Sequence, residues 1–172
     1  METMKTIAIR KSTRKYTDAP VPTEALDAIL LAGCAAPVGR GAYDSLHITV
    51  INTPEGIAKL LAAYETAGRP GNPTFGAPML AIVSAKASAM PALDNANAAC
   101  VAENMIIAAT DFGVGTCYVF GPASLIANTP GLAAEFGIPE EFVPAAGVVI
   151  GMPEEPLTEE RELTLKIGVN YA

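Results

Sequence analysis

The chain has 172 residues, 51% of them hydrophobic, and a formal net charge of -7. This length allows a sizeable core, so we expect a single domain over residues 1–172. The negative charge argues against nucleic acid as a partner, because binding a phosphate backbone needs a broad basic surface. No apolar run is long enough to span a bilayer and no apolar signal stretch opens the chain, so we expect a cytoplasmic protein with no membrane partner.

The basic residues of this acidic chain gather near its start. Five of the 11 lysines and arginines lie at positions 5–15. Such a cluster is self-repulsive unless an anion neutralises it. Arginine forks and a serine hydroxyl suit phosphate oxygens, so Arg10, Ser12 and Arg14 indicate a site for a small phosphate-bearing ligand. The alternative is a solvated basic surface, because charge runs are weak signals.

Apolar spacing, capping residues and turn residues predict eight main elements. Thr53-Pro54-Glu55 is typical of a helix start, with a cap, a proline at the first position and an acid in the first turn. Thr23 is expected to cap an earlier helix. The patterns predict helices over residues 3–10, 23–34, 54–67 and 92–112, and strands over residues 46–51, 79–84, 116–120 and 145–151.

The helix expected over residues 92–112 is apolar almost all round, which is typical of a buried helix. Its many alanines allow close approach of another helix, so it is a candidate for the centre of a subunit interface. A core helix of a monomer is the alternative. Only 17% of the residues are charged. Because such a chain has more apolar surface than a monomer readily hides, we expect a homo-oligomer with a large interface.

Few side chains in this sequence suit catalysis on their own. The three cysteines form no Cys-x-x-Cys pair, and His47 is the only histidine. A zinc site, a Ser-His-Asp triad or a Cys-His pair therefore lacks its residues. We expect no metal site and assign no catalytic side chain. If the protein is an enzyme, a cofactor carries the chemistry.

The stretch from Ile9 to Thr17, which reads Ile-Arg-Lys-Ser-Thr-Arg-Lys-Tyr-Thr, resembles the opening motif of the FMN-dependent nitroreductase-like family. Similar passages follow at residues 104–118 and at Gly-Met-Pro, residues 151–153. In that family the arginines and the serine hold the phosphate and ribityl chain of FMN. The resemblance implies this role for Arg10, Ser12 and Arg14, and for Lys11, where the family often has arginine.

The resemblance implies further contacts with the flavin. Gly121 corresponds to the glycine whose backbone N–H faces the flavin nitrogen that carries the hydride, with Val119 and Phe120 along the same edge. Asn72 lies near where family members often place an asparagine against FMN. The family also returns a late basic residue to the phosphate, and Arg161 fits the spacing after Gly-Met-Pro better than the later lysine.

The glycine-containing loop after Pro37 departs from the family pattern. The family usually carries serine and asparagine side chains there, whereas this chain reads Val-Gly-Arg-Gly at residues 38–41. Backbone groups of Val38 and Gly39, or the side chain of Arg40, would then supply the contacts to the flavin ring.

The resemblance implies an α+β fold, with a mostly antiparallel central sheet of about four strands flanked by helices. It implies an intertwined homodimer with FMN at the subunit interface, contacted by both subunits. The implied activity is ping-pong transfer of hydride from NADH or NADPH, through FMN, to small acceptors such as nitroaromatics, quinones or enones. A flavin carrier or sensor without turnover, a member specialised for one metabolite, and an acidic interaction domain without ligand are alternatives.

Overall fold

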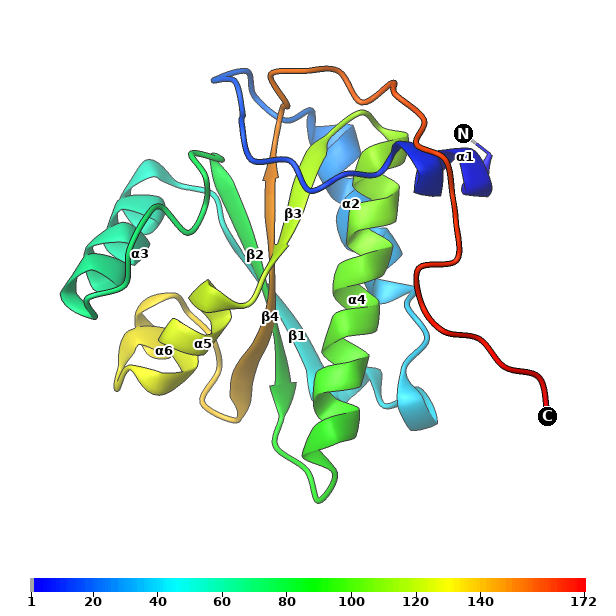
Figure 1. Ribbon diagram of the computed structural model, residues 1–172. Helices are drawn as coiled ribbons and strands as arrows, with labels where there is room; N and C mark the ends of the chain where they lie inside the picture. The colour runs from blue at the N-terminus through cyan, green and yellow to red at the C-terminus, as the bar shows by residue number, and fades with distance from the viewer. Residues whose placement is uncertain (1) are drawn as a thin grey trace.

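A computed structural model describes residues 2–172 (Figure 1). Its centre is a four-stranded sheet in the order β1-β2-β4-β3, and every neighbouring pair in it is antiparallel. The predicted α+β fold with an antiparallel sheet is therefore confirmed. The strands are β1 (Leu46–Ile51), β2 (Met79–Lys86), β3 (Gly115–Val119) and β4 (Phe142–Gly151).

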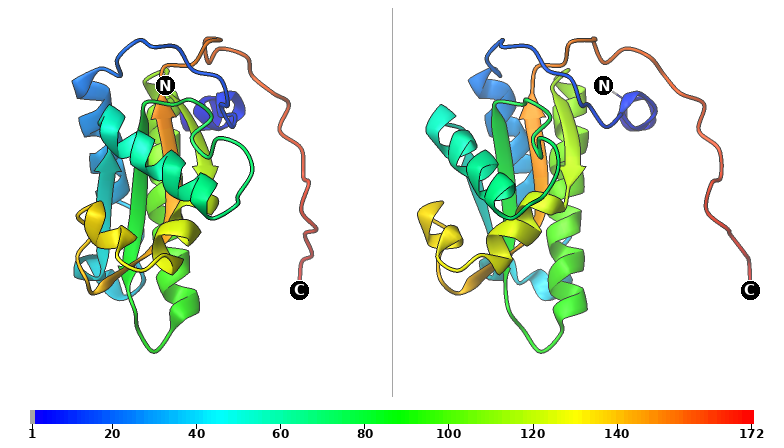
Figure 2. Two further views of the ribbon diagram at one scale, coloured as in Figure 1. Left: turned by 90° about the vertical axis from the view of Figure 1, so that its left-hand side faces the viewer. Right: turned by 60° about the vertical axis from the view of Figure 1, so that its left-hand side comes forward.

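Helices cover both faces of the sheet (Figures 1 and 2). On one face lie the long helix α4 and helix α2, and on the other lie α3, α5 and α6, while α1 sits beside the end of α4. The helices are α1 (Thr3–Ile9), α2 (Thr23–Cys34), α3 (Pro54–Thr66), α4 (Pro91–Asp111), α5 (Gly121–Asn128) and α6 (Leu132–Glu135).

The two central strands are buried on both faces, which explains their nearly continuous apolar sequence. In β2, Ala81 and Val83 face the core under α2 and α4, whereas Leu80 and Ile82 face the core under α3 and α5. This period of two follows from the pleat of the strand. The sheet is thus the shared wall of two hydrophobic cores.

Of the two helix caps that the sequence predicts, one is present and the other is not. The Thr53 side chain accepts a hydrogen bond from the Gly56 N–H at 3.1 Å, as its cap pattern predicts. Thr23, in contrast, is already the first residue of α2, and Pro22 holds the cap position without a side-chain hydrogen bond. The helix is therefore where we expect it, but its predicted cap is wrong by one residue.

One side of α4 belongs to the core and another side borders a surface groove. Ala98, Met105 and Ala109 are fully buried under α2 and the sheet. A groove of about 470 Å³ lies between α1, α2 and α4, lined on α4 by Asn104, Ile107, Ala108 and Asp111. The buried side of α4 therefore agrees with a core helix, and the groove beside it leaves a surface that a second subunit could contact.

After β4 the chain crosses the top of the molecule and then leaves it (Figure 2). Leu157 is the last buried residue, and residues 158–172, here called the C-terminal arm, are exposed and belong to no helix or strand. Within residues 2–172 no helix has both the length and the apolarity needed to cross a membrane.

Candidate functional site

The basic segment near the start of the chain is extended and lies along the sheet. Helix α1 ends at Ile9, and Arg10 has an extended conformation, with φ -52° and ψ 122°. Ser12 then forms a parallel bridge with Thr116 of β3, and the Thr13 N–H donates to the Thr116 carbonyl at 2.8 Å. We call residues 10–16 the edge segment, because they run along β3 at the edge of the sheet.

The extended backbone decides which side chains of the edge segment face outward. Thr13 is buried, whereas Ser12 and Arg14 on either side of it are exposed. Alternation in an extended chain places residues 10, 12 and 14 on the same side. Arg10 and Arg14 therefore lie on the same side because side chains alternate in an extended chain. Their spacing of four residues would also place them on one face of a helix.

The Tyr16 hydroxyl holds the edge segment against the body by donating to the Thr13 carbonyl at 2.8 Å. Burial raises the pKa of Tyr16, and neighbouring Cys117 adds to the rise. The hydroxyl therefore stays protonated as a donor at neutral pH. Tyr16 also pairs with Pro153 just after β4, so the edge segment is attached at two places.

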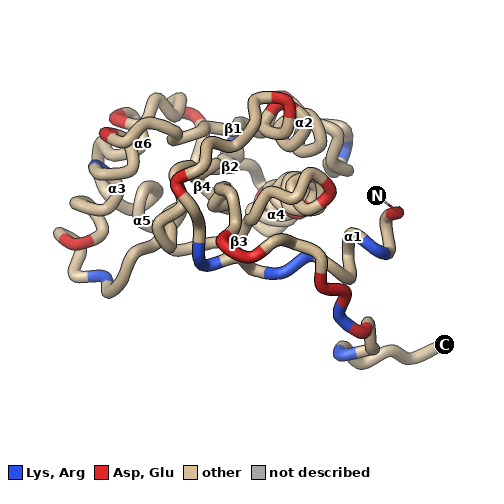
Figure 3. Tube along the Cα trace, turned by 90° about the horizontal axis from the view of Figure 1, so that it is seen from above, with Lys and Arg blue, Asp and Glu red and all other residues tan. Residues whose placement is uncertain are grey.

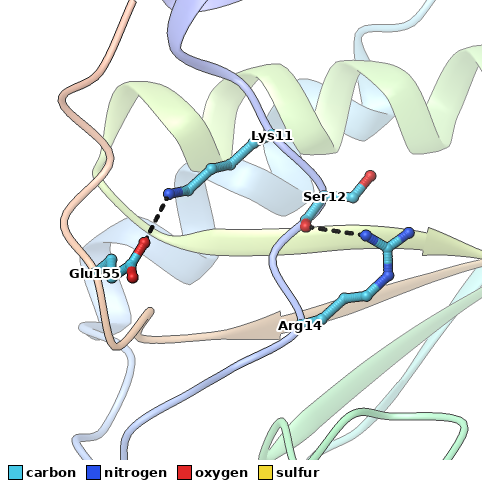
Figure 4. Close-up of polar contacts among 4 residues, drawn as sticks. All are labelled: Lys11, Ser12, Arg14 and Glu155. Carbon is cyan, nitrogen blue, oxygen red and sulfur yellow. Dashed lines mark hydrogen bonds and ion pairs between the residues drawn. The ribbon is translucent and has the colours of Figure 1, made fainter.

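A small cavity of about 260 Å³ lies between the edge segment and the chain after β4, lined by residues 11–15 and 153–155. Lys11 lies 3.4 Å from the carboxylate of Glu155, and Figure 4 shows it turned away from Arg14. Figure 3 shows these basic and acidic segments next to each other. Glu155 is largely exposed and Lys11 is about half-exposed, so this ion pair contributes little to stability.

Arg14 is held by two contacts. Its guanidinium donates to the Ser12 carbonyl at 3.5 Å, and it lies 5.6 Å from the centre of the Phe75 ring (Figure 4). Phe75 belongs to the loop between α3 and β2 and has a left-handed backbone, with φ 54°. A bulky residue seldom adopts that conformation, because its Cβ crowds the backbone. The arginine thus rests on a strained aromatic residue that the sequence alone does not indicate.

Arg161, from the start of the C-terminal arm, joins the other end of the edge segment. Its backbone N–H donates to the Ala8 carbonyl at 3.1 Å, and its guanidinium donates to the Arg10 carbonyl. Two arginines far apart in sequence therefore lie together. Arg10 and Arg161 line one groove together, whereas Ser12 and Arg14 line the cavity beside Glu155. Guanidinium groups and a serine hydroxyl are donors that suit phosphate oxygens.

Gly121 opens α5, directly after β3. Val119 before it is buried, and Phe120 is 62% exposed at the surface. The first amides of a helix have no intrahelical acceptor, so the Gly121 N–H is available at this point of the sheet edge. The Gly121 carbonyl accepts a hydrogen bond from the Arg69 guanidinium at 2.9 Å.

Asn72 lies in the same loop as Arg69 and Phe75, and its side chain shapes that loop. Its Oδ1 accepts hydrogen bonds from the Thr74 N–H at 2.8 Å and from the Thr74 hydroxyl at 2.9 Å. This is the ordinary turn role of asparagine. Its predicted contact with the cofactor stays a prediction.

Val38, Gly39 and Arg40 do not meet the edge segment within one chain. Their loop precedes β1 and lies by the beginning of β4, whereas the edge segment lies by the end of β4. Strand β4 has ten residues and so spans about 33 Å. The Gly39 N–H donates to Asn97 Oδ1 of α4 at 2.9 Å, and Arg40 has a φ of 66°.

These features define a class: an α+β protein that presents basic side chains and free backbone donors along one sheet edge, as phosphate-bearing cofactors require. The profile of the Nitroreductase family matches residues 7–72 and 69–152. The chain belongs to the nitroreductase family.

Relatives agree with this assignment. A protein of Methanothermobacter thermautotrophicus, described as a candidate NADH dehydrogenase/NAD(P)H nitroreductase, is 29% identical over 159 residues, which cover 90% of this chain and 79% of that protein. The crystal structure of a Bacteroides fragilis nitroreductase with bound FMN is similar, with 25% identity, a TM-score of 0.82 and coverage of 99% of this chain and 100% of the other. An FMN-bound nitroreductase from Desulfitobacterium hafniense has the same fold, with 21% identity, a TM-score of 0.83 and coverage of 100% and 98%.

Proposed function

We propose that this protein is an FMN-dependent oxidoreductase that takes hydride from NADH or NADPH and reduces small acceptors such as nitroaromatics, quinones or enones. The observation that supports the proposal is that Arg161 reaches Arg10 at one end of the edge segment and that Ser12 and Arg14 line a cavity further along it, in an acidic protein of the nitroreductase family. Bound FMN would supply the hydride chemistry, and no acid or base side chain is needed for that role.

The residues of the chain divide the work of holding this cofactor. Arg10, Ser12, Arg14 and Arg161 would bind the phosphate, with Lys11 as a further cation beside them. Gly121 follows the strand that the edge segment runs along, and its N–H would face the flavin ring. Positive charge and N–H donors close to the ring favour the negative charge that develops on reduction.

A second copy of the chain would complete the site. The Val38–Gly39–Arg40 loop lies near the opposite end of the sheet from the edge segment, so its predicted contact with the cofactor requires a partner subunit. The exposed groove along α4 and the exposed apolar side chains of the C-terminal arm are surfaces that such a homodimer would cover. Ping-pong turnover at the interface follows from one shared binding place for donor and acceptor.

The purified protein tests the proposal through its visible absorption spectrum and its reduction under anaerobic conditions. We expect a yellow protein that binds FMN in equal proportion to chains and loses its flavin absorbance on addition of NADH or NADPH. Reoxidation by a quinone or nitroaromatic then completes turnover. Bound FMN that neither donor reduces would instead favour the flavin carrier, and a protein with no affinity for FMN would overturn both.

Removing two phosphate contacts gives a sharper prediction. Arg10→Ala with Arg14→Ala should raise the FMN dissociation constant by on the order of 100-fold or more, because each charge-assisted contact contributes about 1.5–3 kcal/mol. The control is Lys5→Ala with Lys86→Ala, which removes the same charge from two exposed ion pairs. Fluorescence titration of FMN measures both. Equal, small losses in the two double variants would contradict the assignment.

A further inference from the structure

The end of helix α3 carries an arginine whose backbone is held in place. Gly68 follows the helix with a φ of 66° and donates its N–H to the Glu65 carbonyl at 2.8 Å. A left-handed glycine after the last turn is a common way to end a helix. The next residue, Arg69, donates its N–H to the Tyr64 carbonyl at 3.1 Å. This hydrogen bond fixes the backbone of Arg69 against the end of α3.

The Arg69 side chain joins α3 to α5. Its guanidinium carbon lies 5.5 Å from the centre of the Tyr64 ring, and its Nη1 donates to the Gly121 carbonyl at 2.9 Å. This contact links residues that are 52 positions apart and partly buries the guanidinium. Stacking on an aromatic ring and a directed hydrogen bond use the planar fork of arginine, which lysine lacks.

Tyr64 also limits the space around Gly121. A methyl group in place of the Gly121 hydrogen would collide with the Tyr64 hydroxyl oxygen, while the next Tyr64 atom is 3.5 Å away, at an ordinary contact distance. The tyrosine hydroxyl is therefore the single close neighbour that requires glycine here. The first residue of α5 is thus fixed from two sides, by Arg69 at its carbonyl and by Tyr64 at its Cα.

We propose that Arg69 and Tyr64 are positioning residues, which hold Gly121 in place at the start of α5, by its carbonyl and its Cα, so that its N–H stays directed at the flavin ring. This inference rests on the proposed function, because it assigns a purpose to the Gly121 N–H. The guanidinium also lies at the positive end of α5, where the helix dipole disfavours a cation. An arrangement that concentrates positive charge there favours a cofactor that becomes negative on reduction.

Substitution of Arg69 tests whether its positive charge favours reduction of the bound flavin. In Arg69→Met, we expect bound FMN to become harder to reduce, with an equilibrium for reduction shifted on the order of tenfold, as loss of one charge-assisted hydrogen bond implies. The FMN dissociation constant should change by less than about threefold, because the phosphate contacts are elsewhere. Arg69→Lys should give an intermediate value, since it keeps the charge without the stacked fork.

The matched control is Lys59→Met, within helix α3, which Arg69 follows. Lys59 also lies over an aromatic ring and pairs with an acid, but it faces Glu135 and Phe136 rather than Gly121. A spectroscopic redox titration of the bound flavin compares the variants, and thermal unfolding of each confirms folding. An Arg69→Met protein that binds FMN with an unshifted reduction equilibrium would overturn the electrostatic part.

A double-mutant cycle tests the steric part without relying on turnover. Gly121→Ala should weaken FMN binding on the order of tenfold or more, because the new methyl group displaces the start of α5 from Tyr64. Tyr64→Phe in the same chain removes the atom that it meets and should restore most of the affinity. Strictly additive effects of the two changes would overturn this contact as the reason for glycine.

The two proposals fail in distinguishable ways. A wild-type protein without affinity for FMN contradicts the proposed function. In that event, the same cycle read by thermal unfolding of the free protein still tests the Tyr64–Gly121 contact. A wild-type protein that binds and reduces FMN, with Arg69→Met identical to it, contradicts only the positioning role.

Discussion

At the scale of single residues, Tyr16 shows how a buried hydroxyl arranges a surface site. Its bond to the Thr13 carbonyl keeps Thr13 inward, and the alternation of the extended chain then turns Ser12 and Arg14 outward. The ring itself packs against the core under α3 and α5. The orientation of the cationic side chains therefore depends on a residue that touches no ligand.

We expect Tyr16→Phe to lower the free energy of unfolding by about 1 kcal/mol at neutral pH, the usual contribution of one hydrogen bond. Because burial raises the pKa of Tyr16 above its ordinary 10.0, the folded state holds this proton more tightly than the unfolded chain does. Stability of the wild type should therefore persist below about pH 10 and fall as the pH rises further.

Urea unfolding between pH 7 and pH 12 measures both effects. The alkaline loss of stability should be smaller in Tyr16→Phe than in the wild type, since the phenylalanine has no proton to lose. Tyr171→Phe is the control, because Tyr171 is 96% exposed. Identical alkaline profiles for the wild type and Tyr16→Phe would argue against this explanation.

At the scale of elements, the loop between α3 and β2 connects the two ends of the proposed cofactor site. Arg69 near its beginning contacts Gly121, and Phe75 near its end supports Arg14. Asn72 and the fully buried Thr74 stiffen the stretch between them. A loop of this length without a helix or strand is commonly functional.

Replacing Phe75 should weaken FMN binding with little net change in stability. In Phe75→Gly, the left-handed position no longer strains the backbone, but the partly buried ring is lost, so we expect the two effects on stability to offset each other to within about 1 kcal/mol. Loss of the ring under Arg14 should weaken FMN binding several-fold, in line with a cation–π contact of about 0.5–2 kcal/mol. Thermal unfolding and FMN titration measure the two effects.

Phe75→Leu separates the causes, because leucine keeps the strained conformation and loses the aromatic face. It should bind FMN as weakly as Phe75→Gly, although it keeps more of the buried apolar side chain. A leucine variant with wild-type affinity would show that the ring is not what holds Arg14.

Local patterns predicted the elements well, because their signals lie within a few residues. The cap at Thr53 and the apolar run of β4 are such signals, and the antiparallel sheet came with the family resemblance. The contacts of Arg69 and Tyr64 with Gly121, and of Phe75 with Arg14, leave no local signal, because they join residues 52 or more positions apart. One usable sign was that Arg69 is among the few basic residues between positions 16 and 160.

At the scale of the whole molecule, the C-terminal arm is the feature that a single chain leaves unexplained. Apolar residues alternate along it, and their side chains are 43%, 87%, 83%, 57% and 96% exposed at Leu163, Leu165, Ile167, Val169 and Tyr171. Alternation of this kind is typical of a strand with one buried face. A second copy of the chain is the occupant that the proposed homodimer supplies.

Leu165→Asp with Ile167→Asp should therefore weaken the dimer, raising its dissociation constant on the order of 10⁴-fold or more, since burial of each such side chain contributes about 1.5–3 kcal/mol and a symmetric dimer would bury four of them. Thr164→Asp with Lys166→Asp places the same residue type at the intervening positions and should have a much smaller effect. Sedimentation velocity over a range of concentrations compares the two. Equal dimer stability in both would mean that the arm does not contact the partner.

The pairing of the edge segment with β3 has a consequence beyond binding. Strand β3 is an outer strand, and an outer strand left bare is a template on which other chains can add. Residues 12 and 13 occupy part of that edge. A protease that removed the chain through the edge segment would thus do more than weaken cofactor binding. It would leave the outer edge of β3 unpaired, and copies of the chain would then aggregate by pairing along that edge.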